Sequence, residues 1–369
     1  MHDTESYDKQ STGGQADAPA VTEEWDGAPR DPAQKWEGAA DYAVPQPRVG
    51  RGIGADGRAA DDEDDDAPTG SGTVAPAAVE EPPLAMEAQR AVQVLNPTGT
   101  ARMPRPDHPR VMCIANQKGG VGKTTTTVNM AVALALGGNR VIVIDLDPQG
   151  NASTGLNVPH HADVPDIYSV LIENVPLIDV AQPVEGIPNL RCVPATIDLA
   201  GAEIELVSVV ARETRLHRAI GAYPEEFDYV LIDCPPSLGL LTVNALVAAR
   251  EVLIPIQTEY YALEGLNQLL SNINLVKAHL NPDLDVSTIL LTMYDRRTRL
   301  ADAVEQDVRN HFGDKVLKSV IPRNVRVSEA PSYGQSVMTY DPGSRGATSY
   351  FEAARELAER GVGRHDGDA

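Results

Sequence analysis

The sequence predicts an α/β protein, with a mostly parallel, twisted sheet that carries helices on both of its faces. Two observations favour this class. After about residue 110, short apolar runs alternate with helical segments, and the runs are apolar throughout instead of alternating with polar residues. Such strands are buried on both faces, which is typical of parallel sheets that crossover helices cover. A chain of 369 residues is long enough for one large domain of this kind and an additional segment.

The additional segment is residues 1–109, which we expect to be a disordered extension. It is rich in Ala, Pro, Gly and acidic residues, and about half of the formal net charge of −22 lies in residues 1–110. Apolar residues are sparse and follow no period, so their burial cannot offset the entropy of ordering the chain. Two interpretations stay open: a solvating extension that includes the acidic run 61–66, or a docking segment at 23–38 that binds a partner such as a polar scaffold protein.

The folded domain is expected over residues 110–360, followed by a flexible C-terminus at 361–369. A first buried strand is expected at 110–116, where the sequence reads RVMCIAN. A loop rich in Gly and Lys follows, and then a helix over 124–138 that ends at two glycines. The second strand is expected within 139–150, where an apolar run leads into two aspartates.

The remaining elements continue the same alternation. Helices are expected between the later strands, among them 202–220 and 262–280. The later strands themselves are expected at 189–195, 227–237, 251–257, 286–294 and 314–322.

Composition favours a soluble cytoplasmic protein. The three cysteines, Cys113, Cys192 and Cys234, are far apart and form no C-x-x-C motif, which fits a reducing compartment and predicts neither a metal site nor a disulfide framework. The acidic, polar start does not resemble a secretory signal, and no apolar run approaches the roughly 20 residues needed to cross a membrane. The negative charge excludes a protein coated with basic surface but allows a local basic patch.

The segment KGGVGKTT is predicted to bind phosphate. It lies between a buried strand and a helix, as the pattern G-x-x-x-x-G-K-[ST] requires, although Gln117 stands where that pattern has its first glycine. Lys123 is expected to reach the β- and γ-phosphates, the hydroxyl of Thr124 to bind Mg²⁺ directly, and Thr125 to donate to the α-phosphate. The whole expected loop is Lys118, Gly119, Gly120, Val121, Gly122, Lys123, Thr124 and Thr125.

Three aspartates at strand ends complete the predicted nucleotide site. Asp233 follows four apolar residues, as in a Walker B strand, and is expected to hold Mg²⁺ through water. Asp145 and Asp147 end the second strand, on the edge of the sheet where ligands bind. Asp147 is expected to orient the attacking water, and Asp145 to support the loop or the metal shell. The plainer alternative for all three is a strand-end or turn residue.

Together these motifs resemble the ParA/MinD group of P-loop ATPases, which carry a deviant Walker A loop. The resemblance is closest to the chromosome-partitioning ParA (Soj) proteins and extends over about 110–357. It rests on the motifs ANQKGGVGKTTTTVN, VIDLDPQGNASTGL, PATIDLAGAEIEL, IDCPPSLGLLTVNAL, EYYALEGLNQLL and VIPRNVRVSEAPSYG.

The resemblance implies an ATP- and Mg²⁺-dependent ATPase that forms a sandwich homodimer when ATP is bound. Lys118 would reach across to the nucleotide of the other subunit, and the small residues Gly119 and Gly120 would allow close approach. Asp147 matches the aspartate that the family needs for hydrolysis, so Lys118, Lys123 and Asp147 are the expected catalytic residues. The residues that the resemblance assigns to the adenine pocket are Met293, Pro322 and Asn324.

Two arginine clusters are predicted to bind DNA. Arg296, Arg297 and Arg299 follow one strand, and Arg323 and Arg326 follow the next, so both clusters are expected at one edge of the sheet. Arginine donates two parallel bonds to phosphate oxygens. By resemblance, Arg297 and Arg326 match arginines that bind double-stranded DNA without sequence preference, in a nucleoid-associated protein whose hydrolysis a ParB-type centromere-binding partner stimulates. The alternative is a solvated charged face.

The leading alternative is a membrane-cycling, division-site ATPase of the MinD type. It would need a basic amphipathic helix at the C-terminus. Residues 349–369 instead combine mixed charge with an acidic end, and their apolar positions are expected to pack on the domain; these positions are Tyr350, Phe351, Ala354 and Leu357.

Three further alternatives have less support from the sequence. An amide-forming synthetase on the same fold would need an inserted substrate domain, which is not visible. An iron–sulfur reductase would need suitably placed cysteines, whereas Cys113 and Cys234 have the pattern of buried packing residues. A sequence-specific repressor would need an N-terminal helix-turn-helix, and the acidic extension shows none.

Overall fold

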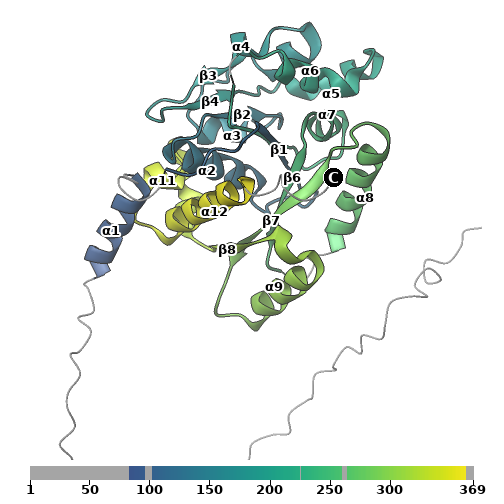
Figure 1. Cartoon of the computed structure of the whole chain (residues 1–369). Helices are drawn as coiled ribbons and strands as arrows, with labels where there is room; N and C mark the ends of the chain where they lie inside the picture. Colours follow the sequence, from purple (N-terminus) through teal and green to yellow (C-terminus); the bar gives the residue numbers. More distant parts are fainter. Residues whose placement is uncertain (1–82, 96–101, 225, 260–263, 363–369) are drawn as a thin grey trace, which may run out of the picture. The chain divides into compact units, whose positions relative to one another are not determined.

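The computed structural model describes residues 83–95, 102–224, 226–259 and 264–362. The chain divides into two units, and all described residues belong to the second, residues 76–369. This unit is built on an eight-stranded sheet with the strand order β3-β4-β2-β5-β1-β6-β7-β8, and helices cover both faces (Figure 1). The predicted fold class is confirmed.

Each predicted strand overlaps one strand of the sheet. Neighbouring strands pair in parallel except for the edge pair β3–β4, which is antiparallel. The two-residue β3 was not predicted, because so short a segment shows no hydrophobic period. The bounds are β1 Arg110–Ile114, β2 Val141–Asp145, β3 Gln182–Pro183, β4 Leu190–Val193, β5 Tyr229–Asp233, β6 Glu251–Gln257, β7 Asp285–Tyr294 and β8 Val316–Pro322.

The described α-helices alternate with these strands. Their bounds are α1 Pro83–Leu95, α2 Lys123–Leu136, α3 Asn151–Gly155, α4 Leu177–Val180, α5 Leu199–Glu205, α6 Arg215–Gly221, α7 Leu240–Ala248, α8 Glu264–His279, α9 Arg299–Phe312, α10 Val325–Glu329, α11 Val337–Tyr340 and α12 Arg345–Gly361. The helix expected at 262–280 is confirmed as α8. The single helix expected at 202–220 is wrong: α5 and α6 are separate, and Ala211 between them has a left-handed φ of 54°, which interrupts a right-handed helix.

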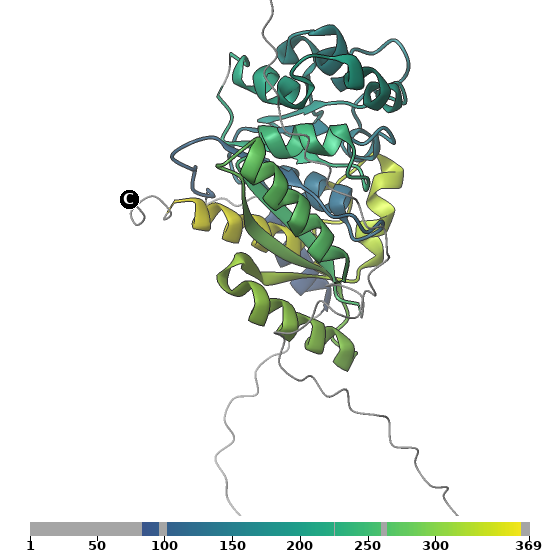
Figure 2. The same cartoon turned by 90° about the vertical axis from the view of Figure 1, so that its right-hand side faces the viewer.

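The sheet is buried on both faces, which explains its continuous apolar strands. Within β2, Val141 and Val143 belong to the buried cluster that includes residues of α2 and α12, whereas Ile142 and Ile144 belong to the second buried cluster, which includes residues of α7 and α8. Figure 2 shows this second face, with α8 in green lying across the sheet. Each buried aliphatic side chain contributes about 1.5–3 kcal/mol to the hydrophobic stabilisation. The two layers therefore hold the carboxyl ends of the strands, where the site lies, on a rigid support.

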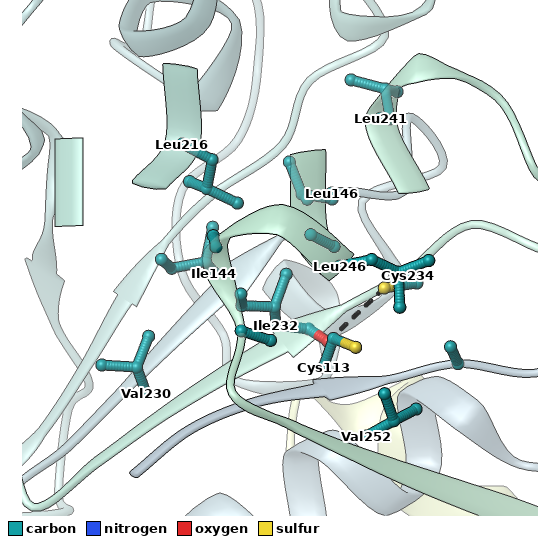
Figure 3. Packing of buried hydrophobic residues seen from close by; sticks show 14 of the residues in the cluster. Cys113, Ile144, Leu146, Leu216, Val230, Ile232, Cys234, Leu241, Leu246 and Val252 are labelled. Carbon is teal, nitrogen blue, oxygen red and sulfur yellow. Dashed lines mark hydrogen bonds between the residues drawn. The ribbon is translucent and has the colours of Figure 1, made fainter. Parts of the chain in front are cut away.

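The cysteines belong to this packing. Cys113 and Cys234 lie in the cluster drawn in Figure 3, next to Ile232, whose carbonyl oxygen is 3.9 Å from the Cys234 sulfur. All three cysteines are free thiols and are buried. The prediction that Cys113 and Cys234 are packing residues is confirmed.

The C-terminal helix α12 packs on α2 and β8. Its first turn is capped by Ser344, whose hydroxyl oxygen accepts a bond of 3.2 Å from the Ala347 N–H. The predicted apolar face is confirmed, since Tyr350, Phe351 and Leu357 are buried in the core. α12 thus has no free apolar face for a membrane surface, and residues 363–369 lie outside the described ranges. No helix in the described ranges is both long and apolar enough to span a bilayer.

The structure corrects the prediction for part of the extension 1–109. Pro83–Leu95 forms the helix α1, and the segment 102–109 runs along the domain, with the Met103 N–H donating to the Gly137 carbonyl at 3.0 Å. Proline in the first turn followed by strong helix formers is a helix signal, but the acidic and proline-rich composition around it obscures this signal. Val94 anchors α1 and is fully buried. Residues 1–82 and 96–101 lie outside the described ranges.

Candidate functional site

The loop between β1 and α2 has the backbone of an anion-binding turn. Gly120 and Gly122 have left-handed φ angles of 76° and 90°, which glycine adopts without strain. A Cβ atom built on Gly119 or Gly120 would meet nothing within 4 Å, so this side of the loop is open. Gly122 precedes the first turn of the 14-residue helix α2 and supplies no side-chain cap. The first N–H groups of a helix have no intrahelical partner, and they attract anions here.

Neighbouring strands hold the loop in place. The Asn116 side chain donates to the Pro255 carbonyl at 2.8 Å, and its oxygen accepts from the Lys118 N–H at 3.0 Å. The Thr292 hydroxyl donates to the Val121 carbonyl at 2.8 Å. The loop is therefore fixed by β6 and β7 before any ligand arrives, which reduces the entropy lost on binding.

Lys123 lies at the start of α2 with only 7% of its surface exposed. Burial lowers the pKa of its ammonium group, and the nearby carboxylates of Asp233 and Asp147 oppose this shift. A buried cation at the N-terminus of a helix is a strong counter-charge for phosphate.

Asp233 ends β5 and faces the first turn of α2. Its two carboxylate oxygens accept bonds from the Thr124 hydroxyl at 2.7 Å and the Thr127 hydroxyl at 2.9 Å. Complete burial raises the pKa of Asp233 to about 8, with the Asp145 carboxylate as the second cause. A hydroxyl and a carboxylate side by side are hard oxygen donors, which Mg²⁺ prefers. The residues present therefore fit a magnesium ion at this position.

Asp145 lies directly beside Asp233, because the parallel register of β2 and β5 pairs these two residues. Its carboxylate accepts bonds from the Ser153 N–H at 2.9 Å, the Ser153 hydroxyl at 2.7 Å and the Asp147 N–H at 3.1 Å. Burial raises the pKa of Asp145 to about 6, and the bonds from Ser153 oppose the rise. This carboxylate joins the end of β2 to α3 and so shapes the loop that carries Asp147.

Asp147 lies just beyond β2, on the same edge of the sheet. It is 8% exposed, and one carboxylate oxygen accepts a bond of 3.0 Å from the Gln149 N–H. In the described ranges, no three His, Cys, Asp or Glu residues are placed to hold a metal together.

Lys118 forms an ion pair that the sequence did not reveal. Its ammonium nitrogen is 3.2 Å from a carboxylate oxygen of Glu259, and the side chains are 38% and 46% exposed. The Gln257 amide donates to the other carboxylate oxygen of Glu259. Glu259 follows β6, so its only sequence signal is a strand end at the predicted edge. Thr127 was missed in the same way, because its partner Asp233 is remote in the chain, and Ser153, eight residues after its partner Asp145, was also missed.

The three residues expected at an adenine pocket lie at the ends of β7 and β8. Met293 is half-buried and has a left-handed φ of 52°. Pro322 pairs in register with Tyr294 and lines a cavity with several arginines. The side chain of Asn324 caps α10, accepting from the Arg326 N–H at 2.8 Å. Their role toward adenine stays a prediction.

Three of the five predicted arginines meet at one cavity of about 620 Å³, namely Arg296, Arg297 and Arg323. Arg297 donates two bonds, of 2.9 and 2.8 Å, to its neighbour Asp295. The other two are not part of this lining. Arg326 pairs with Glu329 at 2.9 Å and with Asp341 at 3.2 Å, and Arg299 begins α9.

Known proteins resemble the chain over this same region. A family model described as an AAA domain matches residues 109–286. The sporulation initiation inhibitor protein Soj of Bacillus subtilis (strain 168) is 54% identical over 253 residues, which are 68% of this chain and 99% of that protein. The chromosome partitioning protein ParA of Myxococcus xanthus is 51% identical over 251 residues, which are 68% of this chain and 88% of that protein.

A solved structure shares the fold. Cobyrinic acid a,c-diamide synthase from Mycobacterium smegmatis, crystallised with ADP and magnesium, is 38% identical, with a TM-score of 0.58. The match covers 67% of this chain and 92% of that chain. The same protein was also crystallised with an ATP analogue and magnesium.

Proposed function

Since the chain belongs to the Soj/ParA family of chromosome-partitioning proteins, we propose that it is an ATPase that partitions DNA. The observation that carries this proposal is the loop between β1 and α2, where the buried Lys123 and the Thr124–Asp233 pair lie beside a second lysine, Lys118. Lys123 and the Thr124–Asp233 pair suit the binding of Mg·ATP, and Lys118 suits a nucleotide that two subunits share.

In this proposal, the loop glycines and the N-terminus of α2 bind the phosphates of ATP, and Lys123 neutralises the β- and γ-phosphates. Thr124 binds Mg²⁺ directly, and Asp233 holds it through water. The bound Mg²⁺ neutralises charge that develops on the phosphate oxygens. The remaining residues of the site position ATP and the attacking water.

Hydrolysis then depends on Asp147, which orients the attacking water. The Gln149 N–H bonds one of its oxygens at 3.0 Å and so fixes the carboxylate. None of the site residues named above is a strong general base, so we expect a slow basal rate. A ParB-type centromere-binding partner accelerates hydrolysis and ends the cycle.

The ATP-bound form is a sandwich homodimer. Lys118 leaves Glu259 and contacts the nucleotide of the other subunit, where a second cation offsets the charge of two facing nucleotides. The dimer doubles the arginine surface built on Arg297 and Arg326, and phosphate contacts increase affinity with charge. DNA of any sequence is therefore bound mainly in the ATP state, which makes the protein nucleoid-associated.

The first experiment is a mobility-shift assay with arbitrary duplex DNA, without nucleotide, with ADP and with ATP, at a fixed salt concentration. We expect binding with ATP alone and to every sequence. Equal binding in all three states would contradict ATP control, and no binding in any state would contradict the partitioning function.

One further candidate function has an observation in its favour. The Mycobacterium smegmatis structure carries the name of an amide-forming synthetase and is 38% identical to this chain. Such an enzyme would hydrolyse ATP only when a carboxylate substrate accepts the phosphoryl group. ATP hydrolysis that DNA and a ParB-type protein do not affect, but that a corrin carboxylate stimulates, would favour this candidate.

A further inference from the structure

The cavity lined by Arg296, Arg297 and Arg323, here called the arginine cavity, is also lined by arginines that were not predicted to bind DNA. Besides Arg296, Arg297 and Arg323, its lining contains Arg90 from α1 and Arg345 from α12. Asp295 is the only acidic residue of this lining among the described residues. Five guanidinium groups and one carboxylate thus surround a single open cavity of about 620 Å³, in a chain whose formal net charge is −22.

Among the described residues, most of these guanidinium groups have no carboxylate partner. Asp295 is engaged by Arg297, and Arg323 is 4.0 Å from Glu259. Within the described residues, no ion pair joins Arg90, Arg296 or Arg345 to a carboxylate. Like charges gathered in this way repel one another, and a bound anion relieves that repulsion.

The position of Arg90 is set by the packing of α1. One turn before it, Glu87 lies so close to Gly343 that a Cβ atom on this glycine would be 2.8 Å from the Glu87 carbonyl oxygen. One turn after it, Val94 is fully buried. α1 is therefore anchored on both sides of Arg90, beside α11 and α12 (Figure 1).

We propose that α1 completes a binding surface for the phosphates of duplex DNA, with Arg90 and Arg345 contacting backbone phosphates next to those bound by Arg296, Arg297 and Arg323. This inference rests on the proposed function and extends it to a helix that precedes the region matched by the family model, which begins at residue 109. In this proposal α1, Pro83–Leu95, is a part of the DNA interface.

The chemistry of the lining favours phosphates over an acidic peptide. The Ser349 hydroxyl lies among the arginines, and hydroxyl and guanidinium donors are the usual partners of phosphate oxygens. Among the described lining residues, only Val320 and Pro322 have wholly apolar side chains, so polar and charged side chains predominate. Duplex DNA carries one charge per roughly 1.7 Å of its axis and can satisfy several arginines at once.

The test uses the full-length protein with ATP, Mg²⁺ and a fluorescent duplex of arbitrary sequence, over a series of salt concentrations. Arg90→Ala and Arg345→Ala are each expected to weaken binding by about tenfold at low salt. Each phosphate contact contributes about 0.9 to the slope of log K against log salt, so one arginine lost per subunit should lower the slope of the dimer by about two. Arg218→Ala, an exposed arginine on α6, is the charge-matched control and should bind as the parental protein does.

Melting curves show whether each variant is folded, and Arg90→Lys should restore most of the salt slope, because it restores the charge. Parental protein that fails to bind DNA contradicts the proposed function itself. Parental binding with an unchanged Arg90→Ala variant overturns the role of α1 alone. Tighter binding by Arg90→Ala also overturns it, and would indicate that an acidic peptide such as residues 61–66 occupies the cavity.

Discussion

Single side chains carry the charges that decide the chemistry of this site. Lys123→Ala removes a buried cation at the start of α2, and we expect this variant to lose ATP binding. Asp147→Ala should keep ATP binding and lose hydrolysis by about 100-fold or more, because the attacking water is no longer oriented. Fluorescent-ATP titration and phosphate release measure the two effects. An Asp147→Ala variant that hydrolyses ATP at the parental rate contradicts this assignment, and a persistent ATP-bound dimer supports it.

Glu259 is the ion-pair partner of Lys118 at 3.2 Å, so it competes with any phosphate for that lysine. Glu259→Gln should release Lys118 while preserving the shape of the side chain and its contact with Gln257. We expect the variant to dimerise at an ATP concentration several-fold lower than the parental protein does. Sedimentation velocity at graded ATP concentrations measures this. The control is Glu305→Gln, which breaks the Glu305–Arg309 ion pair on α9. A shift of equal size in this control would contradict the role of Glu259.

At the scale of elements, the ends of β7 and β8 carry the predicted DNA contacts. Arg297→Glu and Arg326→Glu should each abolish DNA binding, since each dimer gains four units of negative charge, and should leave ATP-dependent dimerisation intact. Mobility shifts and sedimentation on the same samples separate the two properties. Loss of dimerisation in either variant would assign that arginine to the subunit interface or to folding instead.

α12 is the element whose packing closes one face of the sheet. Leu357 is fully buried in it, so Leu357→Ala should lower the free energy of unfolding by about 2–5 kcal/mol. Glu352→Ala, on the exposed side of the same helix, should change it by less than about 0.5 kcal/mol. Urea unfolding followed by circular dichroism measures both. Equal changes in the free energy of unfolding for the two variants would mean that α12 packs only weakly on the domain and is available to bind another surface.

The helices and strands also show which features local sequence patterns can predict. Mostly apolar runs predicted seven strands of the sheet, because burial on both faces favours apolar residues at successive positions. The helix expected at 202–220 failed, because the left-handed residue Ala211 follows tertiary packing and not propensity. α1 was overlooked, because the acidic composition around it obscured a short run of helix formers.

At the scale of the whole molecule, the strand order explains how residues remote in sequence form one site. β5 lies between β1 and β2, so Asp233 meets Thr124 and Asp145, which are remote from it in sequence. The loop itself was predictable, since its motif is contiguous. Two other features were not predictable from the sequence: the pairing of Lys118 with Glu259, and the proximity of Arg90 to the arginines at the strand ends. Both depend on the path of the chain and not on any local pattern.

Because every thiol is buried, we expect the native protein not to react with maleimide dyes. Cys113, Cys192 and Cys234 are packed in the core, so a single cysteine introduced on the surface becomes the one position that takes a label. With two introduced cysteines, one on α1 and one on α9, a dye pair would report in single molecules whether these helices approach or separate as ATP is hydrolysed. No native cysteine would have to be removed for this experiment.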